Sequence, residues 1–272
     1  GDLASAKGDV AVVEDSLPAA LEESVDLKSH QLSGVQWLAR CASIPGRTGV
    51  LLADDMGLGK TLQVLTFLAS AIEHGRTDDS ANTGRDGPFR PILIVAPLML
   101  VDTGTWTREM EQRFRWHGAV FRPWHVLHGH GIAEVQLDSD VPDPLGRVRL
   151  DPKKLMGLRV VITTYETVVN YQHSLAQQVD GRPIWSMVVT DEAQGYKAMR
   201  TKKSHAIKAL QPPFQVAATG TPVETRLLDL WNIMDAVQPG LLGSAREFTR
   251  RFETPLVSES AAESTVLAEL RR

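Results

Sequence analysis

Short runs of apolar residues recur along the chain, and a longer stretch of mixed character separates each run from the next. Most of the runs are continuously apolar instead of alternating with polar residues, which is typical of parallel strands that are buried on both faces. On this pattern we predict strands at residues 49–53, 92–96, 124–127, 160–163, 187–190 and 215–218.

The stretches between these runs show helical periodicity. In one of them, Leu62, Leu65, Leu68 and Ile72 recur at the spacing of a single helix face. We predict helices at residues 31–42, 60–73, 105–116, 167–177, 201–210, 227–237 and 245–252. Because strands and helices alternate, we expect an α/β fold with a mostly parallel, doubly wound sheet and helices on both of its faces. Ligands of such sheets bind at the carboxyl ends of the strands.

Changes of composition divide the chain into a leader, one domain and a tail. Residues 1–26 carry seven acidic residues and one lysine, so we expect an acidic, partly disordered leader. Residues 27–252 are expected to form a single domain, with the polar segments 75–88 and 130–154 as surface loops or insertions. Residues 253–272 are expected to begin a further helical region.

The overall composition is that of an ordinary globular protein, with 43% hydrophobic and 23% charged residues. The net charge of −4 is not the basic balance of a typical nucleic-acid-binding domain, although it does not exclude a local basic stripe. The single cysteine, Cys41, excludes an intramolecular disulfide and a multi-cysteine zinc site, and it fits a reducing, cytoplasmic setting. No apolar run is long enough to span a membrane, so we expect no membrane partner.

Three histidines, His125, His128 and His130, lie close together in the sequence and raise the question of a metal site. No cysteine or carboxylate completes a ligand set beside them at the usual sequence spacing. We therefore interpret them as residues of a strand end and the loop that follows it.

The strongest local signal is a glycine-rich turn between a predicted strand and a predicted helix, with the sequence Asp54-Asp-Met-Gly-Leu-Gly-Lys-Thr61. Gly57 and Gly59 allow backbone N–H groups to wrap around phosphate oxygens, and the positive end of the following helix faces the same phosphates. Lys60 would add a charge for the phosphates, and the Thr61 hydroxyl could bind magnesium. Asp54 stands where the strict phosphate-loop pattern has its first glycine.

A second motif supplies the carboxylates that a phosphate loop needs. The apolar strand predicted at 187–190 ends at Asp191 and Glu192. Asp191 would bind magnesium, directly or through water, and Glu192 would polarise the attacking water. The acidic pair alone is a weak signal, and its weight comes from its order and spacing after the phosphate loop.

In this order the motifs resemble the first motor lobe of the Swi/Snf-type ATPases, a family of superfamily 2 helicase-like DNA translocases. The spelling of the motifs is similar to that of bacterial-type members. In this family an acidic residue is usual at the position of Asp54, which removes the apparent defect in the phosphate loop. The segments that carry the resemblance are 27–38, 54–61, 96–100 with Trp106 downstream, 161–165, 191–194 and 219–227.

The resemblance implies a RecA-like P-loop NTPase domain that binds ATP and magnesium. It implies nucleotide contacts by Gln31, which would read adenine, and by Asp54, Met56, Gly57, Leu58, Gly59, Lys60, Thr61 and Leu62. The implied catalytic residues are Lys60, Asp191, Glu192 and Gln194, with Thr61 and Asp191 as magnesium ligands. The residues implied in nucleic-acid contact or in its coupling to ATP are Pro97, Trp106, Thr164, Thr219, Gly220 and Thr221.

Three departures from the family pattern limit these expectations. Gln194 stands where histidine is more usual, although a glutamine amide can also donate and accept, so coupling to Thr219 and Thr221 is retained as an expectation. Thr225 replaces a common asparagine, which puts one local hydrogen bond in doubt. No match to the family's second motor lobe follows Phe252, so we expect that lobe as a partner, in the same or another chain.

We therefore expect the ATP-hydrolysing lobe of a nucleic-acid-dependent ATPase that moves on duplex DNA by contacts with its backbone. The 272 residues by themselves are expected to be nearly inactive, because the second lobe supplies arginines to the γ-phosphate. Two alternatives stay open: a strand-separating superfamily 2 helicase, and an ATP-dependent protein-interaction module that does not hydrolyse ATP.

Overall fold

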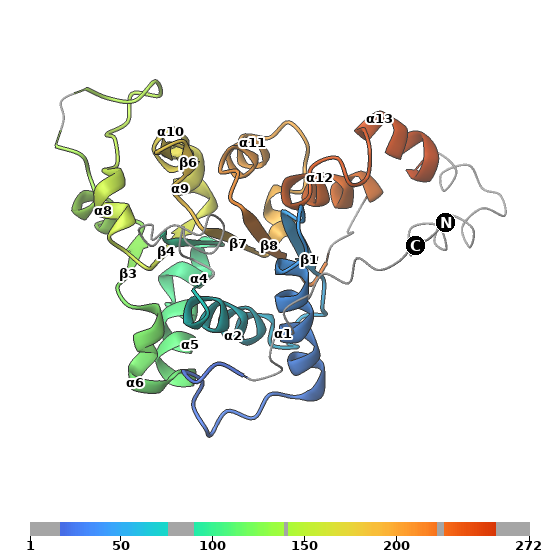
Figure 1. Cartoon of the computed structure of the whole chain (residues 1–272). Coiled ribbons are helices and arrows are strands. Elements are labelled where there is room, and N and C mark those ends of the chain that lie inside the picture. The colour runs from blue at the N-terminus through green and yellow to red at the C-terminus, as the bar shows by residue number, and fades with distance from the viewer. Residues whose placement is uncertain (1–16, 76–89, 139–140, 222–225, 254–272) are drawn as a thin grey trace, which may run out of the picture.

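A parallel six-stranded sheet forms the middle of the domain in the computed structural model, which describes residues 17–75, 90–138, 141–221 and 226–253 (Figure 1). The strand order is β1-β8-β7-β2-β4-β3. The strands are β1 Gly49–Leu52, β2 Ile92–Ala96, β3 Trp124–Leu127, β4 Val160–Thr164, β7 Met187–Asp191 and β8 Phe214–Ala218. All six predicted strands are confirmed to within one residue at each end.

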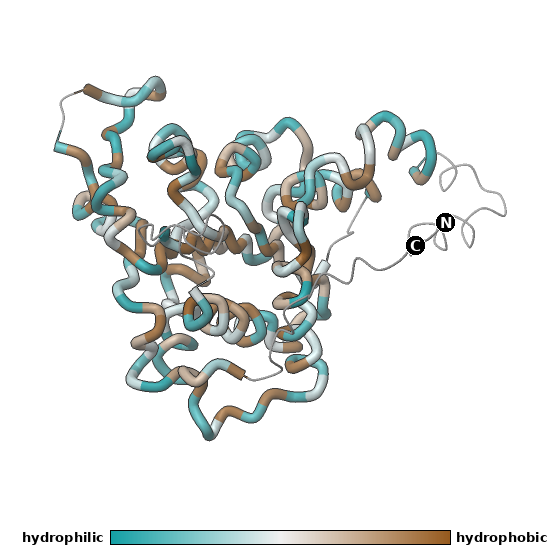
Figure 2. The backbone as a smooth tube through the Cα atoms, in the orientation of Figure 1, coloured by the Kyte–Doolittle hydropathy of each residue, from teal (hydrophilic) through white to brown (hydrophobic). Residues whose placement is uncertain are grey.

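Helices cover both faces of the sheet, as the alternating pattern predicts (Figure 1). On one face, α1 Ser29–Ala42, α2 Lys60–Glu73 and α5 Thr105–Arg113 pack against the sheet through residues such as Leu38, Leu65 and Met110. On the other face, α9 Tyr165–Asn170, α11 Lys202–Ala209 and α12 Leu227–Val237 contribute a second core. Figure 2 shows that the sheet between these layers is predominantly hydrophobic.

Shorter elements complete the described part of the chain. They are α4 Leu98–Asp102, α6 Arg115–Gly118, α7 Gly131–Glu134, α8 Pro152–Met156, α10 Gln172–Leu175 and α13 Ala245–Phe248, with the hairpin β5 Gln178–Val179 and β6 Arg182–Pro183. Two 3₁₀ turns cover Ala119–Phe121 and Ala193–Tyr196, and a π-helical turn covers Thr249–Glu253.

Two predicted helices are wrong in their extent. The helix predicted at 105–116 is interrupted at Phe114, whose backbone is extended and pairs with Leu21 in an isolated β-bridge. The helix predicted at 167–177 begins earlier, at Tyr165, and ends at Asn170 before the separate helix α10. The break at Phe114 follows from a contact with the leader, which the local periodicity could not reveal.

The described part of the predicted leader contacts the domain. Ala20 and Leu21 are buried, and the N–H groups of Ala19 and Ala20 donate to the Glu73 carboxylate at 2.9 and 2.7 Å. Residues 1–16, most of the predicted loop 75–88 and most of the predicted region 253–272 lie outside the described residues.

The predicted insertion at 130–154 contributes to the core as well as to the surface. Val135 and Leu150 are buried, and the neighbouring Gln136 pairs with Leu150 in an isolated bridge. Across the described ranges, none of the helices is both long and apolar enough for a membrane span.

Candidate nucleotide site

Three neighbouring strands bring the predicted motifs together at one edge of the sheet. β8 lies between β1 and β7, and all three strands run parallel. The glycine-rich turn follows β1, Asp191 ends β7, and Thr219 follows β8. The carboxyl ends of the strands therefore gather segments that are more than a hundred residues apart in the sequence.

The glycine-rich turn has the backbone conformation for which glycine is needed. Gly57 and Gly59 have φ angles of 82° and 77°, and Gly59 is the N-cap of α2. A Cβ atom at Gly59 would collide with the side-chain amide of Gln31. After the end of β8, a Cβ at Gly220 would lie 3.5 Å from Lys60 Nζ. The segment that follows β8 therefore lies directly against the glycine-rich turn.

Lys60 lies at the start of α2 with its side chain folded into the turn. Its Nζ donates to the carbonyl oxygens of Asp54 and Asp55 at 2.8 and 3.0 Å, and the residue is only 8% exposed. Thr61 follows in the first turn of the same helix, whose free N–H groups face the glycine-rich turn. This arrangement combines a cation, a hydroxyl and a helix N-terminus around one anion-binding loop.

Two glutamines support the loop from α1 and α2. Gln31 donates through Nε2 to the Leu58 carbonyl at 3.3 Å and accepts through Oε1 from Lys28 N–H at 3.0 Å. The fully buried Gln63 donates through Nε2 to Asp54 Oδ2 at 3.0 Å. Sequence reasoning missed Gln63, although a polar residue within the apolar run of α2 was a signal that could have identified it.

Asp191 is a buried carboxylate with two hydrogen-bond donors. Trp106 Nε1 donates to Oδ2 at 3.1 Å, and the Glu192 N–H donates to Oδ1 at 3.0 Å. Burial, and then the negative charge of Glu192, raise the pKa of Asp191 to about 6, while the hydrogen bond from Trp106 and the charge of Lys60 lower it. The Tyr165 hydroxyl donates to the Asp191 carbonyl at 2.7 Å and fixes the end of the strand.

A chain of hydrogen bonds joins Glu192 to the segment after β8. Gln194 Nε2 donates to Glu192 Oε2 at 2.8 Å, and Gln194 Oε1 accepts from the Thr219 hydroxyl. Thr219 Oγ1 in turn accepts from the Thr221 N–H at 3.1 Å. The glutamine that replaces the usual histidine therefore makes a connection on each side, as its amide chemistry predicts.

Three residues predicted among the nucleic-acid and coupling positions are buried, namely Trp106, Thr164 and Thr219, and Thr219 has no exposed surface. Trp106 and Thr164 are each 1% exposed, and Thr164 accepts from the Thr167 N–H as the N-cap of α9. These three side chains have almost no surface to offer a nucleic acid, so their burial suits the coupling role more than direct contact. Trp106 instead contacts Asp191. Pro97 precedes α4 and is partly exposed, and Thr225 lies outside the described residues.

Two carboxylates approach the histidine group in the fold, one from α7 and one from α4. His125 Nδ1 lies 3.7 Å from Glu134 Oε2, and His128 Nε2 lies 3.8 Å from Asp102 Oδ1. Among the described residues, however, no group of three or more His, Cys, Asp or Glu side chains has the arrangement of a metal site.

At the nucleotide site, the donor set of Thr61 and Asp191 suits magnesium, which usually takes one or two protein ligands together with phosphate oxygens and water.

Comparison with known proteins assigns the family. A family model described as "SNF2-related domain" matches residues 30–272. The chain belongs to the SNF2-related family. This SNF2-related chain is 38% identical over 265 residues to Zorya protein ZorD of Escherichia coli, an alignment that covers 95% of the chain and 23% of that protein. It is 29% identical over 252 residues to the TATA-binding protein-associated factor mot1 of Schizosaccharomyces pombe, an alignment that covers 92% of this chain and 11% of that protein.

The solved structures agree with the fold. The SWI2/SNF2 ATPase core of Sulfolobus solfataricus in complex with dsDNA superposes with a TM-score of 0.68 and 27% identity, covering 92% of this chain and 43% of that one. The family and the RecA-like fold expected from the motifs are therefore confirmed. The SNF2-related chain spans less than a quarter of ZorD and less than half of the Sulfolobus core.

Proposed function

We propose that this SNF2-related domain binds and hydrolyses ATP with magnesium and couples the reaction to movement along double-stranded DNA. The observation that carries the proposal is the convergence of three segments at adjacent strand ends. Lys60 lies in the anion-binding loop, Gly220 abuts that lysine, and Gln194 connects the catalytic carboxylate Glu192 to Thr219.

Each residue of the site has a chemical task in this proposal. Lys60 exchanges its contacts with the loop carbonyls for phosphate oxygens, and the N–H groups at the start of α2 bind the same phosphates. Thr61 and Asp191 hold magnesium, which supplies positive charge where negative charge develops on the phosphates. Glu192 orients and polarises the attacking water, and Gln31 contacts the adenine.

The hydrogen-bond chain through Gln194 is the proposed route of coupling. A shift of the segment after β8 changes the contact between Thr219 and Gln194, and with it the support of the Glu192 carboxylate. DNA that contacts this segment can therefore alter the orientation of the group that activates water. The solved relative in complex with dsDNA supports duplex DNA as the partner.

Strand separation and ATP-dependent protein docking are the competing functions. Lys60, Asp191 and Glu192 are all retained in the motifs at the strand ends on either side of β8, which supports an active ATPase over a docking module. We expect the 272 residues alone to bind ATP but to hydrolyse it slowly, because a second lobe supplies arginines that are typically worth about 10³–10⁵ in rate.

The first test is ATP binding measured by calorimetry with the Lys60→Ala variant. Loss of charge-assisted contacts to phosphate is expected to weaken binding by roughly ten- to a hundredfold. Lys154→Ala is a matched control, since Lys154 Nζ also donates to two backbone carbonyls, those of Glu134 and Gln136, but far from the loop in sequence. Equal affinities for wild type and Lys60→Ala would contradict the assignment of the phosphate loop.

The second test measures ATP turnover and DNA movement with the second motor lobe present. Turnover should increase when duplex DNA is added, and a third strand should be displaced from a triplex without separation of the duplex. Release of single strands from the duplex would favour the helicase, and ATP binding without any turnover would favour the docking module.

A further inference from the structure

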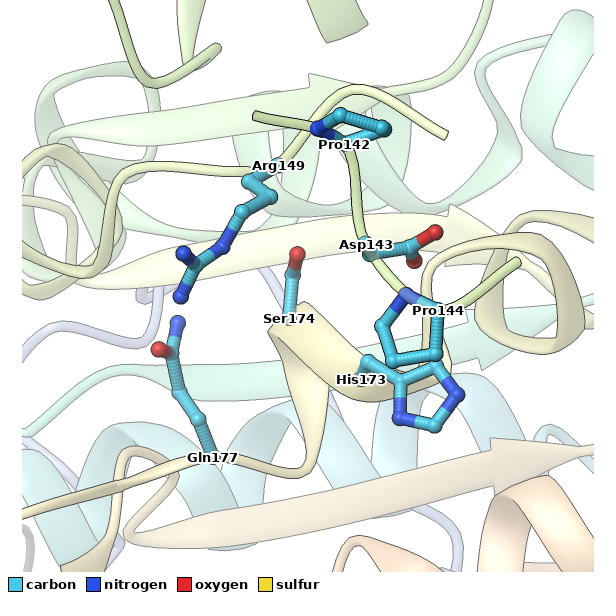
Figure 3. Close-up of a pocket in the computed structure, with 7 residues that line it drawn as sticks. All are labelled: Pro142, Asp143, Pro144, Arg149, His173, Ser174 and Gln177. Atoms are coloured by element: carbon cyan, nitrogen blue, oxygen red, sulfur yellow. The ribbon is translucent and has the colours of Figure 1, made fainter. Parts of the chain in front are cut away.

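A separate cavity of about 270 Å³ lies between the insertion and helix α10 (Figure 3). Pro142, Asp143, Pro144 and Arg149 line it from the insertion, and His173, Ser174 and Gln177 line it from α10 and the segment that follows. The space corresponds to about nine water molecules at about 30 Å³ each, enough for a small organic molecule.

The cavity lies away from the nucleotide site. Gln177 directly precedes the hairpin β5–β6, and Arg90, just before β2, donates to the carbonyls of Val179 and Pro183 in that hairpin at 3.1 and 2.8 Å. This hairpin is therefore near the amino end of β2, whereas the nucleotide site lies at the carboxyl ends of the strands. A ligand in the cavity would not compete with the nucleotide.

Hydrogen-bond donors without acceptors face one another in the cavity. Within the described part of the chain, the guanidinium of Arg149 has neither a hydrogen-bond partner nor an ion-pair partner and belongs to an exposed residue, whereas the buried Gln177 Nε2 has no hydrogen-bond partner. Figure 3 shows these two groups pointing toward each other. Two donors cannot satisfy each other, and the buried Gln177 donor is unfavourable without an acceptor, so an acceptor that bridges Gln177 and the exposed Arg149 would be favoured here.

Ser174 supplies a third donor. The residue is 4% exposed, and its Oγ accepts from the Leu150 N–H at 3.1 Å, which leaves the hydroxyl hydrogen free to donate. In Figure 3 the hydroxyl points into the space between Arg149 and Asp143. Together, Arg149, Gln177 and Ser174 form a donor set for an oxyanion.

Asp143 limits how much negative charge the cavity can accept. Its Oδ1 accepts from the N–H groups of Leu145 and Arg147 at 2.9 and 2.8 Å, whereas its buried Oδ2 has no hydrogen-bond partner among the described residues. The carboxylate is turned away from Arg149 and Gln177 (Figure 3). The donors are therefore free to hold one anionic group, while the nearby carboxylate disfavours a second negative charge. A planar carboxylate also fits the fork of a guanidinium in a bidentate geometry.

We propose that this cavity binds a small monocarboxylate, with its carboxylate held by Arg149, Gln177 and Ser174 and its organic part beside Pro142 and Pro144. The proline rings provide apolar surface for that part of the ligand. The site is independent of the proposed ATPase function, since none of its residues takes part in the nucleotide site.

The test is an NMR titration of the ¹⁵N-labelled protein with acetate as the probe, at constant ionic strength. The side-chain signals of Arg149 Nε–H and the Gln177 amide should shift and saturate. Inorganic phosphate at the same concentrations should produce weaker effects. Arg149→Gln should weaken acetate binding at least tenfold, whereas Arg147→Gln should leave it unchanged, because both arginines are exposed residues of the same loop but only Arg149 lines the cavity.

A second variant, Gln177→Leu, removes an unpaired donor without changing the charge, and it should also weaken binding. Three results would overturn the proposal: shifts that stay linear without saturation, equal acetate affinity in wild type and Arg149→Gln, or tighter binding of phosphate than of acetate. The proposal would also fail if the Gln177 amide signals did not shift, because the amide would then not donate to the ligand. Its oxygen could in that case accept from Arg149 directly.

Discussion

The hydrogen bond from Trp106 to Asp191 predicts a specific defect in a Trp106→Phe variant. Phenylalanine retains most of the aromatic packing but removes the N–H that donates to Asp191 Oδ2 at 3.1 Å in a buried position. This donor stabilises the ionised carboxylate, which is the form that would bind magnesium in the proposed function. Its removal should therefore raise the pKa of Asp191 further above its ordinary value.

The size of the effect follows from the pKa of Asp191, which burial and then the charge of Glu192 raise to about 6. At that pKa the carboxylate is about 90% ionised at pH 7. A hydrogen bond to a charged group contributes about 1.5–3 kcal/mol, so its loss should move the pKa to about 7–8. The ionised fraction at pH 7 then falls to about 10–50%, and magnesium affinity should fall by roughly two- to tenfold.

The assay is magnesium-dependent binding of a fluorescent ATP analogue, measured from about pH 6 to about pH 9, a range that spans both pKa values. Because the defect is a protonation, the affinity of Trp106→Phe should approach that of the wild type as the pH rises. Trp231→Phe is the matched control: Trp231 is also a largely buried tryptophan, but its Nε1 donates to the Gly243 carbonyl at 3.1 Å. Identical pH profiles for the two variants would refute the role of Trp106.

Three further substitutions test other parts of the site. Glu192→Gln should retain ATP binding and lose most turnover with the second lobe present; turnover at the wild-type rate would remove Glu192 from the mechanism. Thr219→Val keeps the side-chain shape but breaks the bond to Gln194, so stimulation by DNA should fall more than basal turnover. In Gly34→Ala, the added Cβ atom would collide with the side-chain amide of Gln63, so the variant should have a free energy of unfolding in urea that is lower by about 1–3 kcal/mol. Gly157→Ala, where a Cβ meets only ordinary contacts, should be nearly neutral.

The sheet could be predicted because most of its strands are buried on both faces and leave a nearly continuous apolar run, although the edge strand β3 is largely half-buried. Helix α2 was predicted with the observed bounds because the glycine-rich turn marks its start and its apolar face is regular. The helix from Thr105 was predicted too long, since its end depends on Phe114 pairing with Leu21 from the leader. Local periodicity contains no information about such a distant partner.

The same distinction applies to the site. Lys60, Asp191 and Glu192 could be singled out as candidates because each lies in a short motif at a predicted strand end, and the structure has those strand ends on either side of β8. Trp106 was placed among nucleic-acid and coupling residues, whereas its partner is a carboxylate 85 positions away in the sequence. Gln63 was missed although it is a polar residue within an apolar run, because the pattern does not show that its amide donates to Asp54 and Leu58 of the glycine-rich turn.

The pairing of β1 with β8 has a consequence for the synthesis of the protein. Gly49 lies opposite Gln215, and β8 is the one strand neighbour of β1 in the described sheet. On the ribosome, the strand that carries the phosphate loop must wait for about 165 further residues, or roughly 10–30 s of elongation, before its partner emerges. Retention of arrested nascent chains on immobilised ATP would therefore report that the sheet has closed, and shorter chains should pass through unbound.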